Sequence, residues 1–241
     1  MANKLVLVAV AGFAVAAVCI GAAAAIGGRE FAGNDFDFSV FGNPACERMG
    51  GATATTRDLD WDGSDQVVLS VPGQVRYTPG SGDKLHLSGD PQTIAHIRLR
   101  DGHVEMDCHS WHDGWQAVTV TLPGRHFRKF GIAGSGALTL DGLNQDRLAV
   151  SIAGSGSIHA NGRVEKLDVH IAGSGDADMG NVTSDVVNVR IAGSGNTDIA
   201  PKDEADIHIA GSGDVNLHSD PARMDTHIAG SGRIRNVGGR T

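Results

Sequence analysis

The chain has 241 residues, 34 of them glycine, and a formal net charge of −8. This length suits one elongated domain or two small ones. The acidic balance leaves no basic footprint for nucleic acid, so the composition excludes nucleic-acid binding and favours an acidic, soluble surface.

The first 25 residues have the layout of a targeting segment. Lys4 supplies a short positive region, Leu5 to Ile20 is apolar, and Ala23–Ala25 offers a small-residue cleavage site. We predict a signal peptide over residues 1–25. The alternative is an uncleaved anchor, because the 22 residues from Leu5 to Ile26 are long enough to span a bilayer. Contact with a membrane is expected only if this segment is retained.

Two cysteines, Cys46 and Cys108, remain once a leader of this length is removed. In an exported chain two cysteines predict one disulfide, which closes a long loop here. The alternative is a Cys/His metal site, since His103, His109 and His112 flank Cys108. Their spacing matches no zinc pattern, so the disulfide is the favoured interpretation.

Residues 26–64 are rich in Gly and Asp and are interpreted as a linker that runs into a first strand or a short helical piece. From Asp65 onward, short runs of alternating apolar residues end at Gly, Pro or Asp. These runs include Ile94, Ile97 and Leu99, which are counted as strand. No sustained helical period occurs, so residues 65–241 are predicted to form one all-β domain.

The sequence Ile-Ala-Gly-Ser-Gly occurs six times between residues 132 and 241, at intervals of 18 to 20 residues. A repeat of this length predicts stacked copies of one structural unit, here a β-solenoid with coils of about 19 residues. The repeats contain no aromatic residue after Phe130, which indicates a thin aliphatic core. The copies start at Ile132, Ile152, Ile171, Ile191, Ile209 and Ile228.

Each unit is predicted to be a strand, a glycine corner, a second strand and a polar turn. In the fifth unit Ala205, Ile207 and Ile209 share the inward parity, and Val215 and Leu217 carry it beyond the corner. Glycines accept the sharp corner, and the serines are expected to stack into a ladder of hydroxyls. The motif lacks the third glycine of a dinucleotide fingerprint and the glycine spacing of a serine-hydrolase elbow.

Residues 65–241 resemble the GIN domain family, labelled auto-transporter adhesin head domains. The likeness comprises an opening strand pair at Gln66–Tyr77, the dipeptide Gly89-Asp90, Leu122-Pro123 before the first repeat, and the serial Gly-Ser-Gly turns. The resemblance implies a right-handed parallel β-helix with an N-terminal β-rich cap, exported to the periplasm or cell surface of a bacterium. It implies no established activity and no catalytic residues.

Outward-facing positions supply three candidate surfaces. The first is an Asp/Asn patch one and three residues after the corners, for which weak calcium binding is a hypothesis, because calcium prefers oxygen ligands. The second is a column in which His208 and His227 lie on adjacent coils beside Arg190. The third is a loop carrying Trp111 and Trp115, interpreted as a ligand platform or as a cover for the end of the helix. The patch consists of Asp176, Asp178, Asn196, Asp198, Asp214 and Asn216.

These features favour a non-enzymatic envelope protein, either a scaffold or an adhesin-like module that binds an envelope protein or a glycan. No cofactor is expected apart from weakly bound calcium. The alternative is a polysaccharide-active lyase or hydrolase that uses Asp176, Asp178, Asp198 and Arg190. A third hypothesis is end-to-end self-association through the C-terminal coil, residues 233–241, where Ile234 and Val237 precede Gly238-Gly239.

Overall fold

The computed structural model describes residues 46, 50–80, 82–108 and 116–238. All of them lie in one compact unit, Gly42–Thr241. The predicted signal peptide, most of the predicted linker, and Trp111 and Trp115 lie outside the described residues. Within the described part of the chain, no helix is both long enough and apolar enough to cross a membrane.

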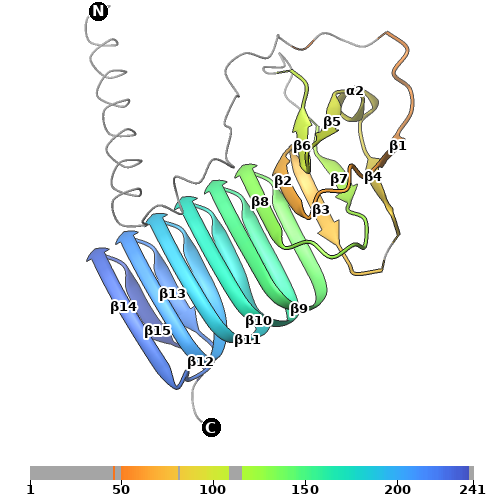
Figure 1. Ribbon diagram of the computed structural model, residues 1–241. Coiled ribbons are helices and arrows are strands. Elements are labelled where there is room, and N and C mark those ends of the chain that lie inside the picture. Colours follow the sequence, from red (N-terminus) through yellow and green to blue (C-terminus); the bar gives the residue numbers. More distant parts are fainter. Residues whose placement is uncertain (1–45, 47–49, 81, 109–115, 239–241) are drawn as a thin grey trace, which may run out of the picture. The chain divides into compact units, whose positions relative to one another are not determined.

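Strands make up nearly all of the regular structure that is described, as Figure 1 shows. The N-terminal elements are β1 (Thr56–Asp60), β2 (Gln66–Ser70), β3 (Gly73–Tyr77), β4 (Lys84–Ser88), α2 (Pro91–Ala95), β5 (Ile97–Arg100), β6 (His103–Met106) and β7 (Val118–Thr121). The repeat elements are β8 (Lys129–Gly134), β9 (Ala137–Gly154), β10 (Ser157–Gly173), β11 (Asp176–Gly193), β12 (Asn196–Gly211), β13 (Asp214–Leu217), β14 (Arg223–Gly230) and β15 (Arg233–Asn236).

The repeats stack as the coils of a parallel β-helix (Figure 1). Each repeat isoleucine pairs with the isoleucine of the next copy, as Ile171 does with Ile152 on one side and Ile191 on the other. The expected fold class, an all-β parallel β-helix with coils of roughly 20 residues, is therefore confirmed.

The polar turns do not interrupt the strands, unlike the prediction of two separate strands per unit. From β9 to β12 each coil is one bent strand of 16 to 18 residues that breaks only at its Ser-Gly corner. Register shifts between neighbouring coils fall in the turn, for example between Met179 and Thr183. Coils of 18 to 20 residues stay aligned at their corners because bulges in the turn absorb the difference in length.

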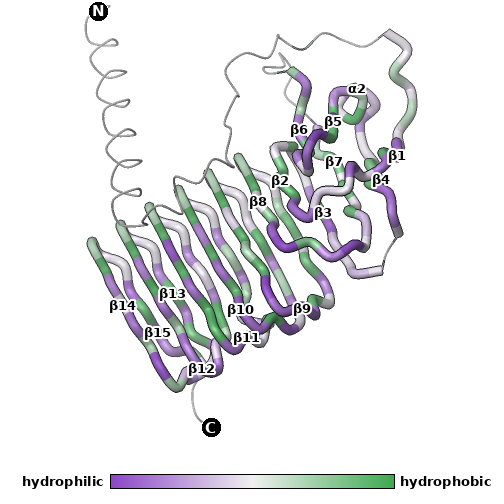
Figure 2. Tube along the Cα trace, viewed as in Figure 1, coloured by the Kyte–Doolittle hydropathy of each residue, from purple (hydrophilic) through white to green (hydrophobic). Residues whose placement is uncertain are grey.

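Apolar and polar residues alternate along the coils, as the colours of Figure 2 show. The buried residues of this alternation form a thin aliphatic core. The predicted inward residues of the fifth unit, from Ala205 to Leu217, are all buried. Aromatic residues fill only the N-terminal end of this core, where the Phe127 ring lies 5.1 to 5.6 Å from three others. Those three rings belong to Trp61, Tyr77 and Phe130.

The corners are joined by the backbone and not by the predicted ladder of serine hydroxyls. The Ser174 N–H donates to the carbonyl of Gly154 over 2.9 Å, and the Ser194 N–H donates to that of Gly173 over 2.8 Å. The six corner serines, all within the described residues, are exposed, and no hydrogen bond joins two of their hydroxyls. Their hydroxyl groups face water, which satisfies them without a ladder.

The N-terminal cap is threaded out of sequence order. Strands β2 and β3 lie between the outer pair β6 and β7 on one side and β8 and β9 on the other. Antiparallel strands β5, β4 and β1 extend the two ends of this arrangement. The parallel ladder of the helix therefore ends against antiparallel strands.

One strand assignment in the cap is wrong: Ile94 belongs to the five-residue helix α2 and not to a strand. The Asp90 carboxylate accepts a hydrogen bond from the Thr93 N–H over 2.9 Å, and Pro91 occupies the first helical turn. An N-cap aspartate followed by proline starts a helix whatever the hydropathy of the next residues.

The predicted disulfide between Cys46 and Cys108 is present, with a sequence separation of 62 residues. It ties the segment before β1 to the end of β6. Both sulfurs are consumed by the bond, so the alternative Cys/His metal site at Cys108 is not formed.

Candidate functional site

The Asp/Asn patch forms one continuous surface, which we call the acidic face: Asp176, Asp178, Asn196, Asp198, Asp214 and Asn216. Its residues come from the strand segments that follow the glycine corners of three coils. Register places them in two columns, since Asp176 pairs with Asn196 and Asp178 pairs with Asp198. Parallel strands lie about 4.8 Å apart, so the side chains of each column are within hydrogen-bonding reach of one another.

In the first column each side chain bonds to the next coil. Asp176 Oδ1 accepts from the backbone N–H of Asn196 over 3.1 Å and from its side-chain amide over 3.0 Å. Asn196 Oδ1 in turn accepts from the Asp214 N–H over 3.1 Å. Asp214 Oδ1 accepts from the Arg233 N–H over 3.0 Å. The column is therefore a fixed chain of hydrogen bonds along the axis of the helix.

In the second column the carboxylates face histidines. Asp178 Oδ2 lies 3.3 Å from His159 Nδ1, and Asp198 Oδ1 lies 2.7 Å from His218 Nε2. Both pairs are partly exposed, with 47% of the Asp178 side chain and 31% of the Asp198 side chain accessible. These carboxylates remain open to a partner from solution although they are oriented within the chain.

Asp214 lies at the basic end of the face. Its carboxylate is 3.3 Å from Arg233 and 3.2 Å from Arg235. The hydrogen bond from Arg233 and the positive charge of both arginines hold the pKa of Asp214 below its ordinary value of 3.8. The acidic face therefore ends in an ion pair that joins the last two coils.

The carboxylates of the acidic face are directed to donors within the chain. Calcium needs six to eight oxygen ligands converging on one point. Here Asp176, Asp198 and Asp214 each direct a carboxylate oxygen to a donor on a neighbouring coil. Among the described residues, three or more His, Cys, Asp or Glu ligand atoms converge only at His96, Asp107 and Cys108.

The sequence did not predict the cluster of His96, Asp107 and Cys108. His96 Nδ1 lies 2.8 Å from Asp107 Oδ1 and 3.4 Å from Cys108 Sγ, and Arg98 lies 2.5 Å from the other Asp107 oxygen. A disulfide sulfur is a poor metal ligand, because the ligand is the thiolate. The cluster instead packs polar groups around the disulfide at the end of β6. His96 lies 12 residues before Cys108 in sequence and is brought there by helix α2.

The histidine column is formed as predicted from the register. His208 pairs with His227 on adjacent coils, and their ring centroids are 5.9 Å apart. His208 Nε2 lies 2.9 Å from Asp206 Oδ1, and Arg190 is the neighbour on the preceding coil. The two rings form a tilted pair, with 39° between their planes, on the face that precedes the corners.

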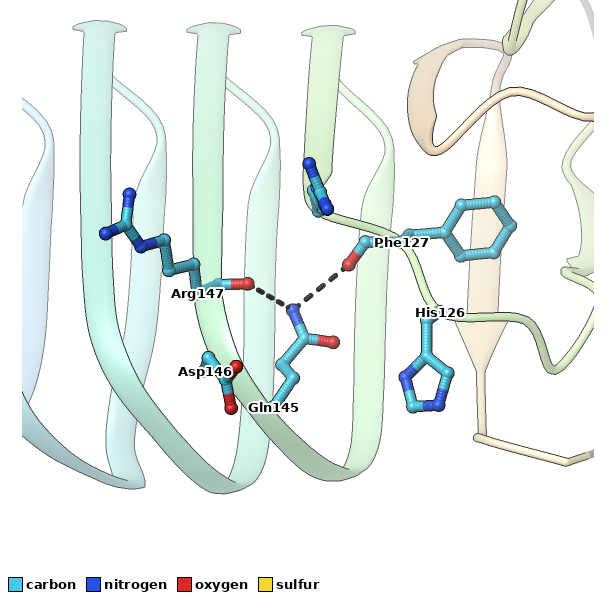
Figure 3. A pocket seen from close by; sticks show the side chains of 6 residues that line it. His126, Phe127, Gln145, Asp146 and Arg147 are labelled. Carbon is cyan, nitrogen blue, oxygen red and sulfur yellow. Dashed lines mark hydrogen bonds between the residues drawn. The ribbon is translucent and has the colours of Figure 1, made fainter.

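A shallow hollow near the polar turn of β9 also escaped the sequence analysis (Figure 3). Its volume is about 420 Å³. Gln145 Nε2 spans it by donating to the carbonyls of Phe127 over 3.0 Å and Arg147 over 2.7 Å. Such bonds bind the first coil to the cap, which gives the hollow a structural role. It is lined by His126, Phe127, Arg128, Gln145, Asp146 and Arg147.

Residues 116–221 match the protein family described as "Putative auto-transporter adhesin, head GIN domain". Over these residues the match confirms the resemblance seen in the sequence. No curated protein matches the chain.

The chain is similar to several solved structures. A putative adhesin from Bacteroides fragilis is 18% identical, with a TM-score of 0.62 over 80% of this chain and 99% of that one. A putative lipid binding protein from Parabacteroides distasonis is 16% identical, with a TM-score of 0.49 over 76% of this chain and 96% of that one. At 18% identity the likeness to the Bacteroides fragilis protein establishes architecture alone.

Proposed function

We propose that this protein is an exported, non-enzymatic binding module of the bacterial envelope, adhesin-like in architecture, and that the acidic face is its contact surface. The observation that carries the proposal is the chain of hydrogen bonds from Asp176 through Asn196 and Asp214 to Arg233. It holds exposed polar groups in fixed order on a rigid sheet. Preorganised groups bind with a smaller loss of conformational entropy than mobile ones.

Export is supported by two further features. The disulfide between Cys46 and Cys108 is of the kind that persists in oxidising compartments. The N-terminal residues 1–25 also have the composition of a secretory signal peptide. Together with the GIN domain, these features favour the periplasm or the cell surface.

The chemistry of the face suits a basic partner. Its carboxylates at Asp178 and Asp198 are partly accessible, and the opposite charge would come from lysine or arginine side chains of an envelope protein or from amino sugars of a glycan. Electrostatic complementarity of this kind sets partner choice and association rate. The shared requirement is a cationic group, and the assay below separates its two sources.

Nothing in the described site favours the alternative of a polysaccharide-active enzyme. A glycosidase needs a carboxyl group with a raised pKa as its general acid. The pKa of Asp214 moves in the opposite direction, because Arg233 and Arg235 stabilise the ionised form. Asp178 and Asp198 are each paired with a histidine.

The test is a binding and turnover screen of the purified protein against envelope extract, amino-sugar glycans and polygalacturonate. We expect binding without turnover, and a loss of about tenfold in affinity for Asp178→Asn combined with Asp198→Asn, since two charged contacts are removed. The matched control is Asp168→Asn, the same change on the other face, where Asn188 donates to Asp168 over 2.5 Å. Turnover of any polymer, or equal effects of both variants, would refute the proposal.

A further inference from the structure

No described strand or helix covers the outer side of the last coil of the β-helix, β14 with β15. Every residue of β14 is exposed, whereas the equivalent residues of β12 alternate between buried and half-buried. Met224 and Ile228 occupy core positions, since they pair with the buried Ala205 and Ile209. Their exposed fractions are 51% and 41%. The hydrophobic core thus opens to solvent at this end.

The backbone at this end is also open. β14 pairs with β12, and no second partner of β14 occurs among the described strands. A free strand edge presents unpaired N–H and C=O groups that recruit another strand, and solenoids normally cover such ends. A strand that pairs with the free edge of β14 would satisfy its backbone groups and bury its exposed core residues at the same time.

The opposite end of the β-helix is already closed, so it does not provide that cover in a second copy. Helix α2 connects β4 to β5 there. Arg57 on β1 fixes it by donating from Nη1 to the carbonyls of Ile94 and Ile97 over 3.3 and 3.2 Å. A head-to-tail stack would bring the open core against a finished cap.

We propose that the C-terminal coil docks onto the C-terminal coil of a second copy, through antiparallel pairing of the two β14 strands about a twofold axis at Thr226. In this register Met224 lies opposite Ile228 of the other copy, so the two exposed core residues cover each other. Asp225 lies opposite His227, and twofold symmetry forms each of these pairs twice. The pairing closes both open cores at once.

Other registers of the same strands fit less well. A shift of one residue places inward side chains against outward ones, which buries polar groups and exposes apolar ones. A shift of two residues in one direction brings Asp225 against Asp225, and in the other direction His227 against His227. Two carboxylates directly opposite each other repel, and two opposed histidines each lose the carboxylate partner that the first register supplies. The sequence of β14, Arg-Met-Asp-Thr-His-Ile-Ala-Gly, is therefore self-complementary about Thr226.

The arginines of β15 do not oppose this dimer strongly. Arg233 and Arg235 lie 3.3 and 3.2 Å from Asp214 of their own chain. That carboxylate offsets part of their charge within each protomer, which reduces the repulsion between two approaching ends.

The experiment is light scattering coupled to size exclusion over a range of concentrations of the full chain. We expect a monomer–dimer equilibrium that stops at the dimer, because an isologous interface is closed. Asp225→His alone places His opposite His, and His227→Asp alone places Asp opposite Asp. Each should raise the dimer dissociation constant by about tenfold, since symmetry disrupts two cross-strand pairs. The double variant with both changes restores the pairs in swapped order and should restore dimerisation.

The rescue distinguishes the register from simple damage to the coil, because the double variant carries both substitutions. Asp203→His, at an exposed position of the β12 turn, is the matched control and should leave the equilibrium unchanged. A protein that stays monomeric at every concentration overturns the proposal, as does an open-ended polymer. The proposal is also overturned if the single variants leave the dimer dissociation constant unchanged, or if the double variant does not restore dimerisation.

Discussion

At the scale of single residues, the two glycines of each Ile-Ala-Gly-Ser-Gly corner serve different purposes. Gly193, the first, has a φ of +135°, and a Cβ there would lie 2.2 Å from the carbonyl oxygen of Gly173 on the preceding coil. Gly195, the second, has no positive φ, but a Cβ would lie 2.2 Å from the Gly175 oxygen. The neighbouring coil, and not a ligand, therefore dictates the repeated motif.

The first repeat provides a matched test of that conclusion. Gly134 shares the positive φ, at +116°, but a Cβ there would meet no atom within 4 Å. We expect Gly134→Ala to cost about 1–3 kcal/mol, from backbone strain alone. Gly193→Ala adds a collision between coils and should cost more than about 4 kcal/mol, in the range reserved for severe disruption. Urea denaturation measures both, and equal losses would contradict the role of stacking.

Acid should loosen the last coil through Asp214. Because Arg233 and Arg235 hold the pKa of Asp214 below 3.8 in the folded state, its ionisation stabilises the fold at neutral pH. That contribution is present above the ordinary aspartate pKa and is lost as the pH falls through the lower, folded value. Between pH 7 and pH 3 the Tm of the protein should therefore fall more than that of Asp214→Asn. Asp203→Asn is the control, and a parallel fall for Asp214→Asn would rule out the ion pair as the cause.

Calcium should leave the protein unaffected. The oxygens of Asp176 and Asp214 accept hydrogen bonds from Asn196 and Arg233, and they do not converge on a common point. A ligand that binds only the native state raises the Tm by mass action. Neither added calcium nor a chelator should shift the Tm; a rise with calcium would restore the calcium hypothesis.

At the scale of elements, the disulfide stabilises the cap more than any single hydrogen bond does. It closes a loop with a sequence separation of 62 residues between Cys46 and Cys108. For a loop of this size the entropy removed from the unfolded chain corresponds to about 4 kcal/mol. Replacing both cysteines by serine should lower the free energy of unfolding by about that amount in urea. The unchanged protein measured under reducing conditions should lose the same amount; an unequal loss would mean that the substitutions act through something other than the bond.

The elements also differ in how far the sequence could predict them. The coils were predictable because one motif recurs and its inward-facing positions repeat. Ile171, Ile191 and Ile209 therefore all lie buried in the core. The cap offers no repetition, and its decisive interactions are between distant residues. Helix α2 was missed because Ile94 was judged by hydropathy, although Asp90 and Pro91 carried a local helix-start signal. The His96 cluster depends on tertiary contacts, which cannot be predicted from the spacing of its residues in the sequence.

The acidic face was predictable only in part, less fully than the coils but better than the cap. Its columns followed from the repeat, and the register bears out the pairing of Asp178 with Asp198. The hydrogen-bond partners did not follow, because His159 and His218 reach the carboxylates from positions that differ between coils. Geometry at that level decides whether the carboxylates converge on one point or are directed along the column. Sequence alone gives the positions of such side chains but not the direction of their polar atoms.

At the scale of the whole molecule, stability should vary along the axis of the β-helix. Each coil contacts only its neighbours, so the stability of an array is approximately a sum of coil and interface terms. β10 and β11 each have a full coil on both sides, and an aromatic cluster around Phe127 supports the first coil. β14 has one neighbour and an exposed core. Local opening should therefore begin at the C-terminal end.

Hydrogen exchange measured at two protein concentrations tests both this gradient and the proposed dimer. In dilute protein, backbone amides of β14 and β15 should exchange fastest and those of β10 and β11 slowest, because exchange follows the free energy of local opening. In concentrated protein the amides of β14 should become protected, since pairing with a second copy stabilises the native coil by mass action. Protection of β10 and β11 should not change. Uniform exchange along the helix would contradict the gradient, and concentration-independent exchange in β14 would contradict the twofold pairing while leaving the gradient intact.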